Sequence, residues 1–178
     1  MSTLITTTAQ IGTIKDAGGN NTAMTIDSTG RVFQPAKPAW RIGRSTGLAG
    51  VNGTTTVLDF DDVADTDRDF FTQGGVTVNS GVVTVPVAGI YHLGSTIRFD
   101  NVSSSYIVVR ITKNNDANST YGAYDIVGNG QSTNYESIGD ATIFKLNASD
   151  TVKIDYYVSN DSSFTIDTRA YFWGYLVG

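Results

Sequence analysis

The chain has 178 residues, enough for one full domain and a short additional segment. Its charged content of 16% and net charge of −5 argue against nucleic-acid binding, which needs a basic surface, and against binding to an anionic membrane. The absence of cysteine excludes a disulfide framework, a thiolate metal site and a cysteine nucleophile. No 18-residue apolar run occurs, so we expect no membrane-spanning segment.

Residues 1–36 differ in composition from the rest of the chain. They contain one aromatic residue, Phe33, of the nineteen in the sequence, too little apolar material to bury a core alone. Short apolar runs separated by Gly- and Asn-rich turns predict short strands, and a disordered leader is the competing interpretation. Met1–Gln10 has neither a basic n-region nor an apolar h-region, so we expect no signal peptide. We predict an extended or β-stranded arm at 1–36 and a separate domain at 37–178.

The segment from Ile14 to Val32, IKDAGGNNTAMTIDSTGRV, resembles a module found at the start of structural proteins of tailed phages, particularly cyanobacterial phages. In those proteins it precedes fibre-like or adhesin-like domains. The resemblance implies that the arm binds other virion proteins.

From Pro38 onward the sequence alternates short apolar runs with Asn- and Gly-rich turns, and no amphipathic helix of ten residues is present. This pattern predicts an all-β, two-sheet antiparallel jelly-roll sandwich. The predicted strands are Ala39–Arg44, Thr55–Phe60, Gly75–Val78, Val82–Val85, Ile90–Asp100, Tyr106–Lys113, Tyr121–Val127, Ser137–Leu146, Thr151–Val158 and Ala170–Val177.

Two features of the sequence are candidates for chemistry, an acidic segment and a single histidine. Asp59–Asp69 contains six aspartates, a density of oxygen ligands that can hold Ca²⁺, but the EF-hand register is absent and a solvated acidic loop is favoured. His92, the only histidine, lies within a predicted strand, and no Gly-x-Ser-x-Gly motif accompanies it. We therefore expect no enzyme and no cofactor, and a structural or interface role for His92.

The last strand is apolar on both faces. Alternation places Tyr171, Trp173 and Tyr175 on one face, and Phe172 and Leu176 on the other. One face fills the sandwich; the second is covered either by loops or by neighbouring copies of the chain. Aromatic residues commonly anchor such interfaces, so packing between copies is the favoured interpretation.

Three segments together resemble the globular heads of the complement (first component, q subunit) and tumour-necrosis-factor superfamily. They are Gly81–Leu93, with its Pro followed by a Gly-aromatic strand start; Leu146–Ile154, with a Leu-x-x-x-Asp-x-Val turn; and the terminal YFWGYLVG. The resemblance implies a homotrimer that binds rather than catalyses and whose C-terminus lies in the trimer core. Tyr91, Tyr171, Trp173 and Tyr175 are the candidate interface residues.

Two functions follow as hypotheses. The first is a trimeric virion protein, in a tail fibre or appendage or on the capsid surface, assembled in the bacterial cytoplasm and displayed on the virion. The second is an adhesin that binds a host receptor or glycan through the loops Asn114–Thr120 and Gly128–Tyr135, with Asn115, Tyr121, Tyr124 and Tyr135 as candidate contacts. A polysaccharide hydrolase has almost no support from the residues.

Overall fold

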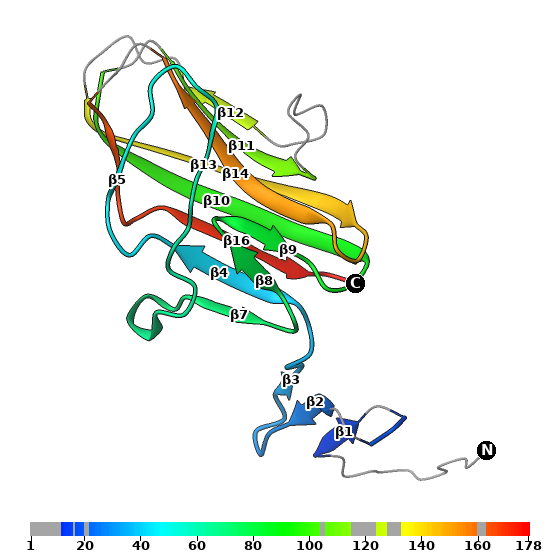
Figure 1. Ribbon diagram of the computed structural model, residues 1–178. Coiled ribbons are helices and arrows are strands. Elements are labelled where there is room, and N and C mark those ends of the chain that lie inside the picture. Colours follow the sequence, from blue (N-terminus) through cyan, green and yellow to red (C-terminus); the bar gives the residue numbers. More distant parts are fainter. Residues whose placement is uncertain are drawn as a thin grey trace. The chain divides into compact units, whose positions relative to one another are not determined.

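The structure is a computed structural model, and it describes residues 12–15, 17–19, 22–103, 106–114, 124–127, 133–159 and 163–178. The chain divides into two compact units, Met1–Lys37 and Pro38–Gly178. The predicted boundary between residues 36 and 37 lies one residue before this division. The two units are described separately (Figure 1).

The first unit is a small antiparallel sheet of β1 (Thr13–Lys15), β2 (Thr22–Ile26) and β3 (Val32–Phe33). The turn between β2 and β3 is organised by Asp27, whose Oδ1 accepts hydrogen bonds from the backbone N–H groups of Thr29 and Arg31, at 2.8 and 3.0 Å. Gly30 has a φ of +82°, which closes the reversal. The Thr29 hydroxyl, followed by Arg31, lowers the pKa of Asp27 to about 2.

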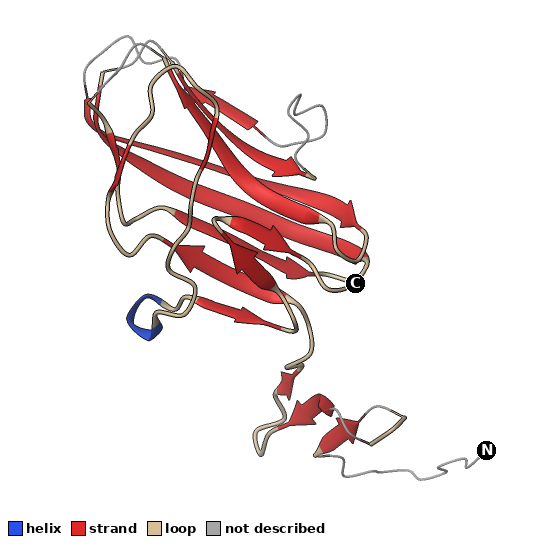
Figure 2. Ribbon diagram, in the orientation of Figure 1, coloured by secondary structure: helices blue, strands red, loops and turns tan. Residues whose placement is uncertain are grey.

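The second unit is an antiparallel sandwich of two sheets, which confirms the predicted all-β class (Figure 2). The central strand of the first sheet is β10, which pairs with β13 along one of its edges. Along its other edge, β10 pairs with both β16 and β15. Beyond β16 lie β4 and then β7, and beyond β15 lies β5. The strands of this sheet are β4 (Ala39–Gly43), β5 (Leu48–Ala49), β7 (Phe71–Gln73), β10 (Gly89–Val102), β13 (Thr133–Leu146), β15 (Thr165–Ile166) and β16 (Tyr171–Leu176).

The second sheet runs in the order β12-β11-β14-β9-β8, and the short strand β6 also pairs with β14. Its strands are β6 (Thr56–Val57), β8 (Thr77–Asn79), β9 (Val82–Thr84), β11 (Ile107–Lys113), β12 (Tyr124–Val127) and β14 (Thr151–Val158). Within the described residues, the only helical segment is the single 3-10 turn η1 (Thr66–Arg68). No helix of this part of the chain has the length and apolarity needed to cross a bilayer.

One hydrophobic core fills the space between the two sheets of the second unit. Alternate residues of β10, including Leu93, Ile97 and Phe99, are completely buried, because successive strand residues face opposite sides of a sheet. Trp40 of β4 packs edge-on against Phe172 of β16, with ring centres 5.7 Å apart. Among the described residues, every buried hydrophobic side chain of the core belongs to Trp40 or a later position, so this unit contains its own core.

Several short elements were not predicted from the sequence. The strands β5, β7 and β15 contain two or three residues each, too few for an alternating pattern to be recognised. The predicted strand Thr55–Phe60 is reduced to Thr56–Val57, and the acidic segment after it contains η1. These elements depend on pairing with distant strands rather than on local periodicity.

Asp150 ties the turn between β13 and β14 to the end of β11. Its carboxylate accepts hydrogen bonds from the Asn147 backbone N–H and from Asn114 Nδ2, both at 2.8 Å, and pairs with Lys113 Nζ at 2.9 Å. Burial by itself would raise the pKa of Asp150, but these hydrogen bonds and the Lys113 charge outweigh it and lower the pKa to about 2.

We therefore expect the free energy of unfolding to depend on Asp150 at acidic pH. Because the folded-state pKa lies below the ordinary value of 3.8, its contribution is full above about pH 4 and is lost as the pH falls towards about 2. Asp150→Asn should be less stable than the wild type at pH 7 and converge with it near pH 2. Urea unfolding across this range tests the prediction, and a difference that stays constant with pH would contradict it.

Candidate functional site

The outward side of the first sheet carries a cluster of aromatic side chains from β10 and β16. Across the ladder, His92 pairs with Tyr175 and Gly94 pairs with Trp173. Tyr171, Trp173 and Tyr175 lie on this outward side, while Phe172 between them is completely buried. The structure therefore places the terminal aromatic residues as their alternation predicts.

The rings of the cluster contact one another closely. Trp173 and Tyr175 are stacked with their ring centres 6.4 Å apart, and the His92 ring stands perpendicular to Trp173 at 5.1 Å. His92 Nδ1 lies 3.0 Å from the Tyr175 hydroxyl, a hydrogen bond that links the two strands. The Trp173 indole lies directly over Gly94, where a Cβ atom would come within 2.1 Å of the ring. Only glycine at position 94 leaves room for this arrangement.

Aliphatic side chains extend the cluster across the sheet. Ile143 of β13 pairs with His92 and is 65% exposed, and Ile90 of β10 is 46% exposed. Tyr175 itself remains 44% exposed. We call the set Ile90, His92, Ile143, Trp173 and Tyr175 the outer aromatic face. Contiguous apolar surface of this kind, on a sheet whose other side fills the core, is typical of an interface between proteins.

Arg41 and Tyr171 border the outer aromatic face on the side of β4. The Arg41 guanidinium lies 4.9 Å from the centre of the Tyr171 ring, and its Nη1 donates a hydrogen bond to the Arg68 carbonyl at 2.6 Å. These two contacts fix the position of the Arg41 guanidinium. A positively charged group therefore lies at this border of the outer aromatic face.

The prediction that Tyr91 lies at an interface is wrong. Tyr91 is completely buried in the core, where its ring lies 6.3 Å from Trp40 and its hydroxyl donates to the Val87 carbonyl at 2.9 Å. Burial raises its pKa. The next residue, His92, faces outward instead. Ile143 was also not predicted from the sequence as part of the outer aromatic face. Its neighbour Phe144 is buried, and alternation along the strand then indicates that Ile143 faces outward.

Of the predicted loop contacts, the structure describes the side chain of one. Asn115 and Tyr121 lie outside the described residues, and Tyr124 is described only by its backbone, which pairs with Arg110. Tyr135 of β13 is 63% exposed, and the guanidinium of Arg98 lies 4.0 Å from the centre of its ring.

Arg98 is in turn held by Asp100, with Nε and Oδ1 2.7 Å apart. Tyr135 lies on the same strand as Ile143 but eight residues away, roughly 27 Å at about 3.4 Å per residue. The exposed tyrosine is therefore distant from the outer aromatic face.

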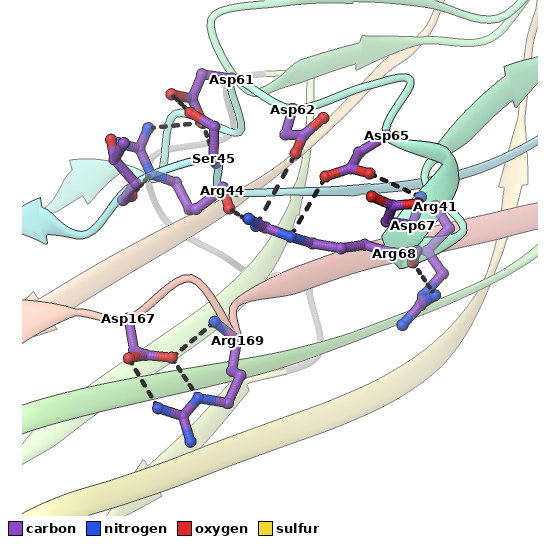
Figure 3. Close-up of polar contacts among 11 residues, drawn as sticks. Arg41, Arg44, Ser45, Asp61, Asp62, Asp65, Asp67, Arg68, Asp167 and Arg169 are labelled. Carbon is purple, nitrogen blue, oxygen red and sulfur yellow. Dashed lines mark hydrogen bonds and ion pairs between the residues drawn. The ribbon is translucent and has the colours of Figure 1, made fainter.

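Three aspartates of the acidic segment, Asp61, Asp62 and Asp65, interact with hydroxyl, backbone or arginine groups through their carboxylates (Figure 3). Asp61 accepts hydrogen bonds from the Ser45 N–H at 2.9 Å and the Ser45 hydroxyl at 2.8 Å. Burial opposes ionisation of Asp61, yet these bonds and Arg44 keep its pKa below the ordinary value. Asp65 caps η1 through the Asp67 N–H at 2.8 Å and pairs with Arg68 at 3.3 Å.

These contacts give the acidic segment a structural role that its composition alone did not indicate. Arg68 also approaches Asp62 at 4.0 Å and donates to the Arg44 carbonyl at 2.6 Å (Figure 3). Within the part of the chain that the structure describes, no three acidic or histidine side chains are grouped as metal ligands. Calcium binding by Asp59–Asp69 stays a hypothesis without a described ligand set.

Comparison with known proteins identifies the fold. No protein-family profile matches the chain, and no curated protein matches it in sequence. Among solved structures, it is similar to murine APRIL, crystallised at pH 8.0, with a TM-score of 0.58 and 14% identity. The match covers 79% of this chain and 99% of the APRIL chain. The sandwich is a jelly roll of the tumour-necrosis-factor type.

Proposed function

We propose that this protein is a non-enzymatic, homotrimeric structural component of a tailed-phage virion. Its N-terminal unit attaches it to the particle, and its jelly-roll head projects from the surface. The head belongs either to a tail fibre or appendage or to a capsid decoration.

The outer aromatic face is the observation that carries this proposal. A monomer would leave Ile143, Tyr175 and part of Trp173 in water, although burial of such side chains is favourable by roughly 25 cal/mol per Å² of apolar surface. Tumour-necrosis-factor-like folds assemble as homotrimers, which supports self-association through this face. A cyclic trimer is a closed assembly that covers the face on every copy.

The virion role is supported by the likeness of residues 14–32 to the first module of tailed-phage structural proteins. A chain without cysteine suits assembly in the reducing cytoplasm of a bacterial host. A location on the finished virion surface follows from attachment at one end of the chain and a binding-type head at the other.

A non-enzymatic role is supported by the surroundings of His92. It bonds to the Tyr175 hydroxyl and packs on Trp173, both within the outer aromatic face. A general base needs a nucleophile or substrate proton within reach, and a histidine enclosed by neighbouring copies would have neither.

Light scattering at micromolar concentration tests the proposal. We expect a particle with three times the mass of the 19.0 kDa chain. A mass of one chain would contradict the trimer, and a chain that assembles but never accompanies purified phage would contradict the virion role.

A glycan-binding adhesin is the second candidate, favoured by the exposure of Tyr135. Its ring is held by Arg98 on one side, and tyrosine rings commonly stack on sugars. If a glycan array gives a signal, Tyr135→Ala should abolish it, whereas Tyr106→Ala, at a tyrosine 40% exposed just before β11, should retain it. Equal signals from the two variants would exclude Tyr135 as the contact.

A further inference from the structure

Among the described residues of the first unit, the small sheet has an apolar side that is left partly exposed. Ile14 pairs with Met24, and Ile26 pairs with Val32, so these four side chains share one side of the sheet. Ile14 is 40% exposed and Val32 is 57% exposed. We call Ile14, Met24, Ile26 and Val32 the arm face.

The opposite side of the same sheet is mainly polar. Thr13 pairs with Thr25, and Thr25 pairs with Phe33, the single aromatic residue of the unit. A three-stranded sheet gains stability when a second layer covers its apolar side, and a single layer of this size is marginal. The arm face therefore requires another layer to cover it.

The connection to the head limits which surfaces can supply that layer. Only residues 34–38 separate the end of β3 at Phe33 from the start of β4 at Ala39, a span of at most about 20 Å. Pro35 and Pro38 stiffen this connection. β4 pairs with β16, the strand that carries Trp173 and Tyr175 of the outer aromatic face.

In the proposed trimer, the three connections would therefore start from strands that adjoin the interface. Short tethers raise the effective concentration of linked units to the millimolar range, so a small apolar surface can associate without high intrinsic affinity. The other two arms of the same trimer are then the most concentrated apolar partners available to each arm.

We propose that the three N-terminal sheets of one trimer pack their arm faces against one another and form a three-sided stem. Each arm face is then covered by the arm faces of the two other copies. This inference rests on the proposed trimer. Phe33, 58% exposed on the opposite side, stays on the outside of the stem, where it can contact the virion.

Single-cysteine variants of the full chain provide the test, because the natural sequence has no cysteine. Val32→Cys places a thiol on the arm face, and Ile14→Cys is a second position in case the first disturbs the sheet. Thr13→Cys is the matched control on the opposite side of the same strand pair. The rate of maleimide labelling is measured for each variant and divided by its rate in denaturant, with the mass checked by light scattering.

We expect the two arm-face thiols to react at least about tenfold more slowly than the Thr13→Cys thiol in the trimer, because labelling then requires local opening. In the Trp173→Asp background, if it is monomeric, the protection should disappear. Equal reactivity of all three thiols in a confirmed trimer would overturn the stem and leave the trimer intact.

Two other outcomes also decide the matter. Protection that persists in a monomeric background would overturn the stem, because the arm face would then be covered by its own chain. A wild-type protein of monomeric mass would overturn both the stem and the trimer. Light scattering distinguishes this last case from failure of the stem alone.

Discussion

Replacing Trp173 with aspartate should convert the proposed trimer into monomers while leaving the head folded. Trp173 lies on the outward side of β16, stacked on Tyr175 and perpendicular to His92, and outside the core. In an assembled trimer the new carboxylate would be removed from water without a partner. Central aromatic residues of interfaces commonly contribute about 2 kcal/mol or more when truncated.

The measurement is light scattering at micromolar concentration, with circular dichroism to check the fold. Ile143→Asp should act in the same direction, because Ile143 pairs with His92 on the same face and is 65% exposed. Val51→Asp is the matched control: Val51 is 45% exposed in the loop after β5, and the trimer should tolerate the change. If Trp173→Asp and Ile143→Asp both remain trimeric, the interface lies elsewhere.

Deleting residues 1–36 should leave the head folded and abolish its incorporation into virions. The hydrophobic core begins at Trp40, and the contacts of the chain separate at Lys37. The loss of the arm therefore removes none of the described core residues, and we expect the unfolding temperature to change by no more than about 4 °C. Attachment should be lost because, in the proposed function, the arm is the part that binds the particle.

Thermal unfolding and the protein content of purified phage particles are the two measurements. A deleted chain that fails to fold would show that residues 1–36 belong to the core. A deleted chain that folds and still joins the particle would place the docking surface on the head, and its outward-facing role would have to be abandoned. Phe33→Asp in the full chain offers a milder test of attachment through the exposed aromatic residue of the arm.

The sequence by itself determined the all-β class, the long strands and the faces of the last strand. These depend on local periodicity: in a strand, neighbouring side chains face opposite sides, so buried Phe172 implies outward Tyr171 and Trp173. The low aromatic content before Trp40 likewise indicated a segment without a core of its own. Each of these properties depends on residues that are only a few positions apart in the sequence.

Only the tertiary structure decided which residues meet across strands. Tyr91 and His92 are both amphipathic, and local pattern could not say which one enters the core; the packing of Tyr91 against Trp40 settled it. The partners of His92 are Tyr175 and Ile143, 83 and 51 positions away, and their pairing depends on strand register. The contacts of Asp61 with Arg44 and Ser45, and the short strands β5, β7 and β15, arise in the same way, because hydrogen-bonding partners far apart in sequence leave no local signal.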